Sequence, residues 1–173
     1  MAAQGKWDEL HEMVRGLQQV TFALRHAPKP VVTAVHQMAL GGGVEMAMAG
    51  WETVAAHESY MGLVEMGVGV IPAGGGCKEL LRRKVNPVMR AKNADVLPVM
   101  QEVFEQIALA KVGTSAWEDK ALGYLRPKDI IVMNSDHRLY LAKERVLQLV
   151  ADGVRPPEVE KIYAAGRDTY YAL

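Results

Sequence analysis

Two glutamates stand beside runs of glycine, and this combination suits proton transfer next to a carbonyl group. Glu45 directly follows a glycine run in the segment ALGGGVEMAMAG (39–50), and Glu65 lies in the segment MGLVEMGVGVIPAGGG (61–76). One carboxylate can donate a proton and the other can accept one, while backbone N–H groups exposed at glycine can hold a developing oxyanion. The residues alone leave a second interpretation open, in which Glu45 caps a helix or lies on the surface and Glu65 belongs to a turn. Apolar neighbours favour the chemical interpretation, because an unpaired carboxylate among them is costly.

Length and composition limit the number of domains and the kinds of partner that this chain can have. The chain has 173 residues, enough for one domain with a real core, which we divide into residues 1–98 with the two glutamate motifs and a mostly helical part, 99–173. Lys plus Arg equals Asp plus Glu at 20 each, so we expect no nucleic-acid or anionic-membrane partner. The only cysteine, Cys77, excludes an internal disulfide, and we expect it to be a small packed residue.

The sequence also carries no targeting or metal signal. No apolar run resembles a signal peptide or reaches the length of a spanning helix, which predicts a cytoplasmic, soluble protein. The five histidines are scattered without ligand spacing, so no metal site is expected. The dinucleotide-binding pattern of glycines is missing as well, and no cofactor is expected in this chain.

The elements that must hold the glutamates follow from hydrophobic periodicity. Apolar residues at three-and-four spacing predict a helix over 7–24, and a continuous β-branched run predicts a strand over 31–35, buried on both faces of a largely parallel sheet. A helix is expected over 44–49 with Glu45 in its first turn, where the helix dipole favours an anion. Further predictions are a strand over 51–56, a polar turn over 57–59, an ordered glycine-rich loop over 62–76, a helix over 77–84 closed by Asn86-Pro87, a helix over 99–111, a helix capped by Ser115, a strand over 129–132, and a helix from Asp136 to Gly153.

The stretch from Lys29 to Arg83 resembles the crotonase (enoyl-CoA hydratase/isomerase) superfamily. The resemblance rests on a strand, a turn, the motif ALGGGVE, a second strand, then GLVE and IPAGGG, all in register over about sixty residues. It implies an α/β crotonase-like (ββα spiral) fold that is incomplete at its N-terminal side and has a helical C-terminal part.

The resemblance also assigns roles to residues. The Gly42 N–H is expected in the oxyanion hole for a thioester carbonyl, while Glu45 and Glu65 are expected to activate water and deliver a proton to C2 of an enoyl chain. Which glutamate is the acid and which the base stays open. Substrate contact is implied for Leu40, Gly41, Gly62, Pro72 and Gly74.

A narrower likeness covers nearly the whole chain. The stretches YMGLVEMGVGVIPAGGGCKE and KALGYLRPKDIIVMNSDHRLYLAKERV resemble the C-terminal crotonase-like part of large bacterial 3-hydroxyacyl-CoA dehydrogenases of fatty-acid β-oxidation. This likeness implies an acyl-CoA substrate and NAD only in a separate dehydrogenase portion that is missing here.

Three departures from the family pattern matter. Gln37 stands where the family usually has glycine, and Val64 replaces a common proline. The resemblance also implies an earlier segment that supplies the second oxyanion N–H, and we expect that segment to be absent from this chain. Losing one such donor costs about 2.7–4 kcal/mol of transition-state stabilisation, so we expect the chain alone to be weakly active or inactive.

Open apolar faces and an open sheet edge lead us to expect self-association, trimer-like as in crotonases. Two other functions stay open. One is a non-catalytic acyl-CoA-binding or assembly module within the dehydrogenase, and the other is a hydrolase or decarboxylase that uses the same oxyanion hole. The basic run Arg82, Arg83 and Lys84 is either a solvated helix end or a contact for CoA phosphates.

Overall fold

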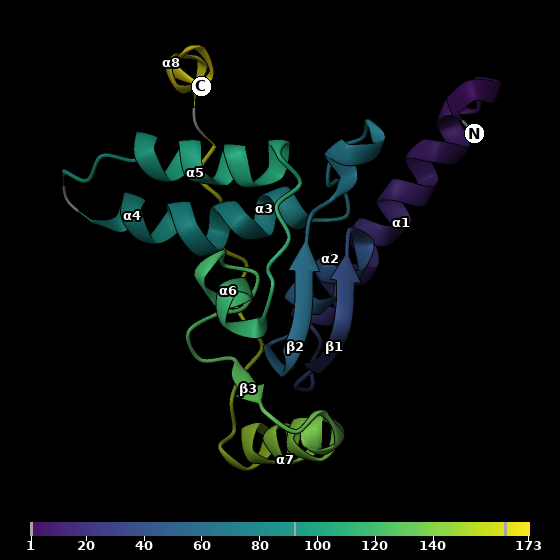
Figure 1. Ribbon diagram of the computed structural model, residues 1–173, viewed down its shortest axis with the longest axis vertical. Coiled ribbons are helices and arrows are strands. Elements are labelled where there is room, and N and C mark those ends of the chain that lie inside the picture. The colour runs from purple at the N-terminus through teal and green to yellow at the C-terminus, as the bar shows by residue number, and fades with distance from the viewer. Residues whose placement is uncertain (1, 92, 165) are drawn as a thin grey trace.

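Three parallel strands form the sheet of the computed structural model, in the order β1-β2-β3 (Figure 1). The structure describes residues 2–91, 93–164 and 166–173. Strand β1 (Val32–Leu40) pairs with β2 (Glu52–Gly62), and the first half of β2 pairs with β3 (Ile130–Val132). Because parallel neighbours need crossover connections, α2 joins β1 to β2 and a longer helical segment joins β2 to β3.

Helices make up most of the rest of the described chain. Their α-helical members are α1 (Trp7–Arg25), α2 (Gly42–Ala49), α3 (Gly76–Leu80), α4 (Asn86–Arg90), α5 (Leu97–Ala108), α6 (Ala116–Ala121), α7 (Arg138–Ala151) and α8 (Arg167–Ala172), and the shorter turns are the 3₁₀ helices η1 (Ala2–Gln4), η2 (Glu65–Val68) and η4 (Ser135–His137) and the π-helix η3 (Leu81–Val85). None of the helices within the described residues is long and apolar enough to cross a membrane.

The sheet separates two apolar clusters. Val54 and Ala55 are neighbours on β2, and because side chains alternate along a strand they face opposite ways. Ala55 packs with residues of α2, α3, α5 and α6 such as Met48 and Leu80, while Val54 packs with Ala142 of α7. The result is a helix–sheet–helix arrangement with the larger core on the side that carries α2.

Helix α1 confirms the predicted amphipathic helix, with one added residue. Its C-terminal half packs near α2, whereas its first turns project away from the other elements (Figure 1). Trp7 is 63% exposed at that projecting end, so the apolar face of α1 is only partly covered.

The predicted polar turn at 57–59 is wrong, because β2 runs without a break to Gly62. The extra residues are taken up by a register shift: Val35 pairs with Ala55 and Gln37 pairs with Ser59, so β2 advances four residues while β1 advances two. Strand β1 is also longer than predicted and is not buried on both faces, since the successive residues 36–38, whose side chains alternate between the two faces, are all exposed.

Asn86-Pro87 does not close the helix that begins at the glycine run. The chain passes from α3 through the π-helical η3 into α4, with Pro87 in the first turn of α4. A proline lacks the N–H that an α-helix would use, and its ring crowds the preceding turn. The wider π turn just before Pro87 relieves that conflict, so the helical path continues to Arg90.

Later elements follow the sequence closely, with shifted ends. Helix α5 begins at Leu97 with Pro98 in its first turn, and Ser115 caps α6 by accepting a hydrogen bond from the Glu118 N–H at 3.3 Å. The predicted cap of the next helix is wrong. The Asn134 side chain accepts from the Asp136 N–H at 3.0 Å, and α7 starts at Arg138.

A buried carboxyl joins α6 to the end of β2. The Asp119 side chain is fully buried, and its Oδ1 accepts the Met61 N–H at 3.0 Å, while Oδ2 has no hydrogen-bond partner in the described part of the chain. Burial raises the pKa of Asp119 from an ordinary 3.8 to about 7, and the nearby charge of Glu118 adds to the rise.

This shift makes stability depend on pH. Between pH 4 and pH 7 folded Asp119 keeps a proton that the unfolded chain has lost, so the free energy of unfolding falls as the pH rises through that window, by up to about 1.4 kcal/mol per unit. We expect Asp119→Asn to remove this term. Denaturant unfolding at several pH values checks it, with the exposed Asp8→Asn as control, and parallel curves for the wild type and Asp119→Asn would contradict it.

Candidate functional site

The N-terminus of α2 follows directly on β1 through a glycine in an unusual conformation. Gly41 has φ 54°, in the left-handed region that favours glycine, and its carbonyl accepts the Glu45 N–H at 3.1 Å. Gly42 is the first residue of the helix, so its N–H has no partner within the helix. Gly42 is exposed, and a Cβ placed on it would meet no described atom within 4 Å, so this first residue of α2 is accessible from outside.

Glu45 lies in the first turn of α2 with its side chain buried. Its Oε1 accepts the Gly76 N–H at 2.8 Å, from the end of the second glycine segment. A Cβ on Gly74 would lie 2.2 Å from the other oxygen, Oε2, and one on Gly76 would lie 3.1 Å from Oε1. Only residues without a side chain allow the loop to approach this carboxylate so closely.

Helix α1 holds this loop in place over Glu45. Gln18 donates from Nε2 to the carbonyl of Ala73 at 2.7 Å, and the Thr21 hydroxyl donates to the carbonyl of Gly74 at 2.8 Å. The sequence did not identify these two positioning residues. Their only signal is a polar side chain at each of two positions on a predicted amphipathic helix, which is common on solvated faces.

Glu65 begins η2 and is only partly buried. A Cβ on Gly41 would lie 3.3 Å from its Oε1, so the carboxylate packs against the turn that starts α2. Its Oε2 is buried and has no hydrogen-bond partner among residues 2–91, 93–164 and 166–173. Burial raises the pKa of Glu65, and the negative charge of Glu45 raises it further.

The ends of the two strands bring these parts together. The Gly41 N–H donates to the carbonyl of Gly62 at 2.8 Å, which joins the turn after β1 to the last residue of β2. Both glutamates, the Gly42 N–H and the strand ends therefore belong to one region at the C-terminal edge of the sheet.

The structure divides the residues expected to contact substrate into two groups. Leu40 and Gly62 end β1 and β2, with Gly41 next to them. Pro72 and Gly74 line a cavity of about 400 Å³ between the loop and α1. Leu40, Gly41 and Gly62 are not part of that cavity's lining, which also includes Gln18, Thr21, Phe22, Ala73, Gly75, Cys77 and Lys78.

Gln37 has a strained backbone conformation at the position where the family usually has glycine. Its φ is 56°, a value that costs a residue with a side chain about 1–2 kcal/mol, and it lies at the register shift of β1. Val64 adopts φ −105° without strain just before Glu65. Neither departure displaces a carboxylate from the site.

The basic run after the site is not a solvated helix end. Arg83 is buried and donates to the carbonyls of Met48 and Tyr124 at 2.8 and 2.5 Å, so it ties the end of α2 to the segment after α6. Arg82 pairs with the buried Glu79, whose carboxyl has a pKa lowered to about 2 by this neighbour, and Lys84 pairs with Glu102.

Comparisons with known proteins bear on the family and the fold of this chain. A model of the enoyl-CoA hydratase/isomerase family matches residues 1–96. A probable 3-hydroxyacyl-CoA dehydrogenase of Bacillus subtilis (strain 168) is 41% identical over 165 residues, which cover 95% of this chain and 20% of the relative. A probable enoyl-CoA hydratase of the same organism is 42% identical over 65 residues, covering 38% of this chain and 25% of that protein.

The solved structures support the same fold. An enoyl-CoA hydratase from Polaromonas sp. JS666 superimposes with a TM-score of 0.65 at 25% identity, over 87% of this chain and 51% of that one. The chain thus spans a fifth to a quarter of these two curated relatives and about half of this structure. The crotonase-like α/β fold expected from the sequence is confirmed.

The contact between Gly74 and Glu45 gives a test of the loop. In Gly74→Ala the new methyl group would overlap Glu45 and Leu17, so one of them must move, and we expect a loss of about 1–3 kcal/mol in the free energy of unfolding. Gly67→Ala is the matched control, because a Cβ there meets nothing within 4 Å. Denaturant unfolding of both variants measures the difference, and equal effects would contradict the close packing.

Proposed function

Because the chain belongs to the enoyl-CoA hydratase/isomerase family, we propose that it acts on coenzyme A thioesters by adding water to a trans-2-enoyl-CoA or by isomerising it. The observation that carries the proposal is the position of two carboxylates beside the open N-terminus of α2. Glu45 is fixed by the Gly76 N–H, and Glu65 packs on Gly41, directly before the Gly42 N–H.

The proposed hydration uses three groups of the chain. The Gly42 N–H donates to the thioester oxygen and stabilises negative charge there as water attacks C3. Glu45 accepts the proton that the attacking water loses, and Glu65 gives a proton to C2. One water molecule is thereby added across the double bond, and the proton that Glu45 takes up balances the one that Glu65 releases.

The environment of each carboxylate supports this division of roles. Burial and the charge of Glu45 raise the pKa of Glu65, so Glu65 keeps its proton to higher pH than an ordinary glutamate and can act as an acid. Within the part of the chain that the structure describes, the Glu65 Oε2 accepts no hydrogen bond. Glu45 accepts a backbone N–H through Oε1, which fixes its orientation as a base.

The wider proposal places this activity in fatty-acid β-oxidation, within a larger 3-hydroxyacyl-CoA dehydrogenase. The support is the Bacillus subtilis relative, of which this chain matches a fifth. Any NAD would then bind a dehydrogenase portion outside these residues. The single cysteine fits a reducing compartment, so the proposed location is the cytoplasm.

The two glutamates provide the direct test, in the complete gene product that carries this chain. We expect Glu45→Gln and Glu65→Gln each to lower kcat for hydration of crotonyl-CoA by about 10²–10⁴, because each removes a proton-transfer group. Glu58→Gln, at an exposed position on β2, is the matched control and should leave the rate unchanged.

Two results would set the proposal aside. Unchanged rates in both active-site variants would show that other groups carry the chemistry. Calorimetry that detects acyl-CoA binding by a protein without turnover would favour the non-catalytic module instead.

We also propose that the chain associates with copies of itself. The outer edge of β1 is unpaired among the described strands, and Met38 on that strand is 76% exposed. Trp7 on the projecting end of α1 adds further open apolar surface. At micromolar concentration, light scattering of this chain is expected to give a mass above one copy, with a trimer as the proposed state, and a clean monomer would contradict this.

A further inference from the structure

The end of β2 on the α6 side is held by side chains. Strand β3 pairs only with Val54, Ala55 and Ala56. Farther along, the Met61 N–H donates to Asp119 Oδ1 at 3.0 Å and the Leu63 N–H donates to the Tyr124 hydroxyl oxygen at 3.2 Å. Alternate residues of a strand direct their N–H groups to the same edge, so these two bonds flank Gly62.

A second segment locks the same edge. The Tyr124 hydroxyl donates to the carbonyl of Lys111 at 2.9 Å, and the Gly113 N–H donates to the carbonyl of Met61 at 3.0 Å. A Cβ on Gly62 would lie 2.7 Å from the Val112 side chain, so this segment packs tightly against the strand. Tyr124 therefore bridges two backbone segments through a single oxygen.

The residue between the two flanking bonds reaches the candidate site. The Gly62 carbonyl accepts the Gly41 N–H at 2.8 Å, and Gly41 sets the start of α2 and with it the position of the Gly42 N–H. Glu65 follows two residues after Leu63. A displacement of the Met61–Leu63 backbone would thus shift both the oxyanion donor and the second carboxylate.

Burial of these polar side chains lowers the stability of the fold. Tyr124 and Asp119 are fully buried, and Asp119 Oδ2 has no hydrogen-bond partner among the described residues. Apolar residues of similar size would avoid the cost of burying these side chains, but they would leave the Met61 and Leu63 N–H groups and the Lys111 carbonyl without these partners. The hydrogen bonds that the cluster does form converge on the backbone that leads to the site.

We propose that Tyr124 and Asp119 are positioning residues for the reaction: by fixing the N–H groups of Met61 and Leu63 they set the distance between the Gly42 N–H and Glu65. This inference rests on the proposed function for its catalytic consequence. Its structural part, the restraint on Gly62 and Gly41, can be measured without any substrate.

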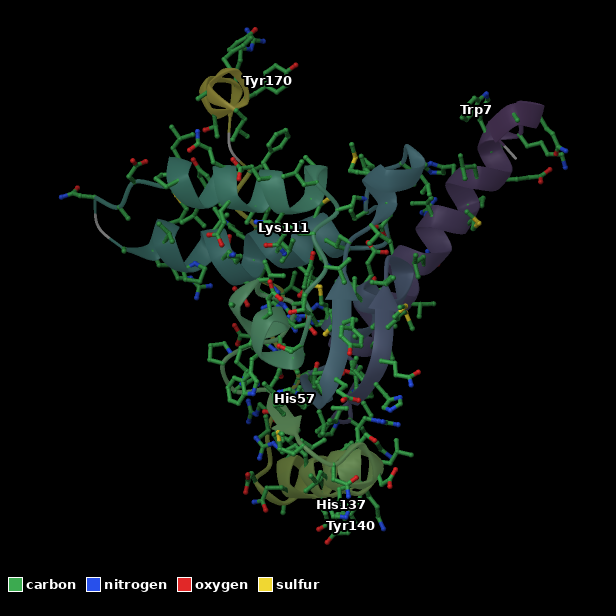
Figure 2. All side chains as sticks on the ribbon, viewed as in Figure 1. Trp7, His57, Lys111, His137, Tyr140 and Tyr170 are labelled. Carbon is green, nitrogen blue, oxygen red and sulfur yellow. The ribbon has the colours of Figure 1, made fainter. Side chains whose placement is uncertain are left out.

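Tyr124→Phe tests the inference, because it keeps the ring and removes only the hydroxyl. We expect amide hydrogen exchange at Leu63 and Gly41 to become at least about tenfold faster. In the complete gene product, kcat for crotonyl-CoA hydration should fall about tenfold while KM changes less than about twofold, since misplacement of reacting groups affects the chemical step. Tyr140→Phe, at an exposed site on α7 at the opposite end of the molecule, is the matched control (Figure 2).

Asp119 supplies a second pair of variants. Asp119→Asn keeps an oxygen that can accept the Met61 N–H and should retain kcat within about threefold, whereas Asp119→Ala should lose about tenfold or more. If Asp119→Ala does not fold, Tyr124→Phe and Asp119→Asn still test the positioning role.

The outcomes separate the two proposals. Unchanged exchange at Gly41 in Tyr124→Phe, or an unchanged kcat in an active enzyme, overturns the positioning role. A wild-type protein with no hydration activity overturns the proposed function, and the exchange measurements then decide the structural inference alone.

Discussion

The whole site depends on one constraint: each glutamate packs against the glycine segment that carries the other. Glu45 accepts its hydrogen bond from Gly76 and touches Gly74, while Glu65 lies against Gly41. Side chains on these glycines would occupy the space of a carboxylate oxygen or crowd it. The two segments are therefore mutually dependent, and neither carboxylate has its position without the backbone of the other segment.

The surrounding fold serves this contact from three sides. Helix α1 fixes the loop through Gln18 and Thr21, and the parallel pairing of β1 and β2 brings Gly41 to Gly62. Arg83 secures the far end of α2 through the carbonyl of Met48. Burying the Arg83 guanidinium and the Thr21 hydroxyl costs stability, and their bonds to the carbonyls of Met48, Tyr124 and Gly74 offset part of that cost.

The sequence was a good guide to the elements near the glutamates and a poor one to their connections. Periodicity identified α1, and the glycine runs identified the start of α2 and the ordered loop, because these patterns reflect local backbone preferences. The continuation of β2 through His57 and the passage across Pro87 could not be predicted. Both depend on partners distant in sequence, namely the register of β1 and the π turn of η3.

The sequence did not reveal the residues that join α6 to β2, again because their partners are distant in sequence. Asp119 lies in the short helix α6 and Tyr124 in the turn that follows it, and only the fold shows that their polar atoms point to backbone N–H groups at the end of β2. Buried polar side chains of this kind produce no periodic pattern in the sequence. By contrast, the two catalytic candidates were found because their glycine neighbours are unusual in composition.

The register shift between β1 and β2 sets a rule for how the length of this region can vary. At the shift, β1 advances two residues, from Val35 to Gln37, while β2 advances four, from Ala55 to Ser59. Strand β2 therefore gains two residues over β1, an even number. Because side chains alternate with a period of two, the inward and outward faces of β2 stay in phase on both sides of the shift, and Ala55 and Met61 both face the larger core. A single inserted or deleted residue here would turn every later side chain of the strand over and present the wrong edge to the glycine turn. Length changes among homologues should therefore occur at this bulge in steps of two.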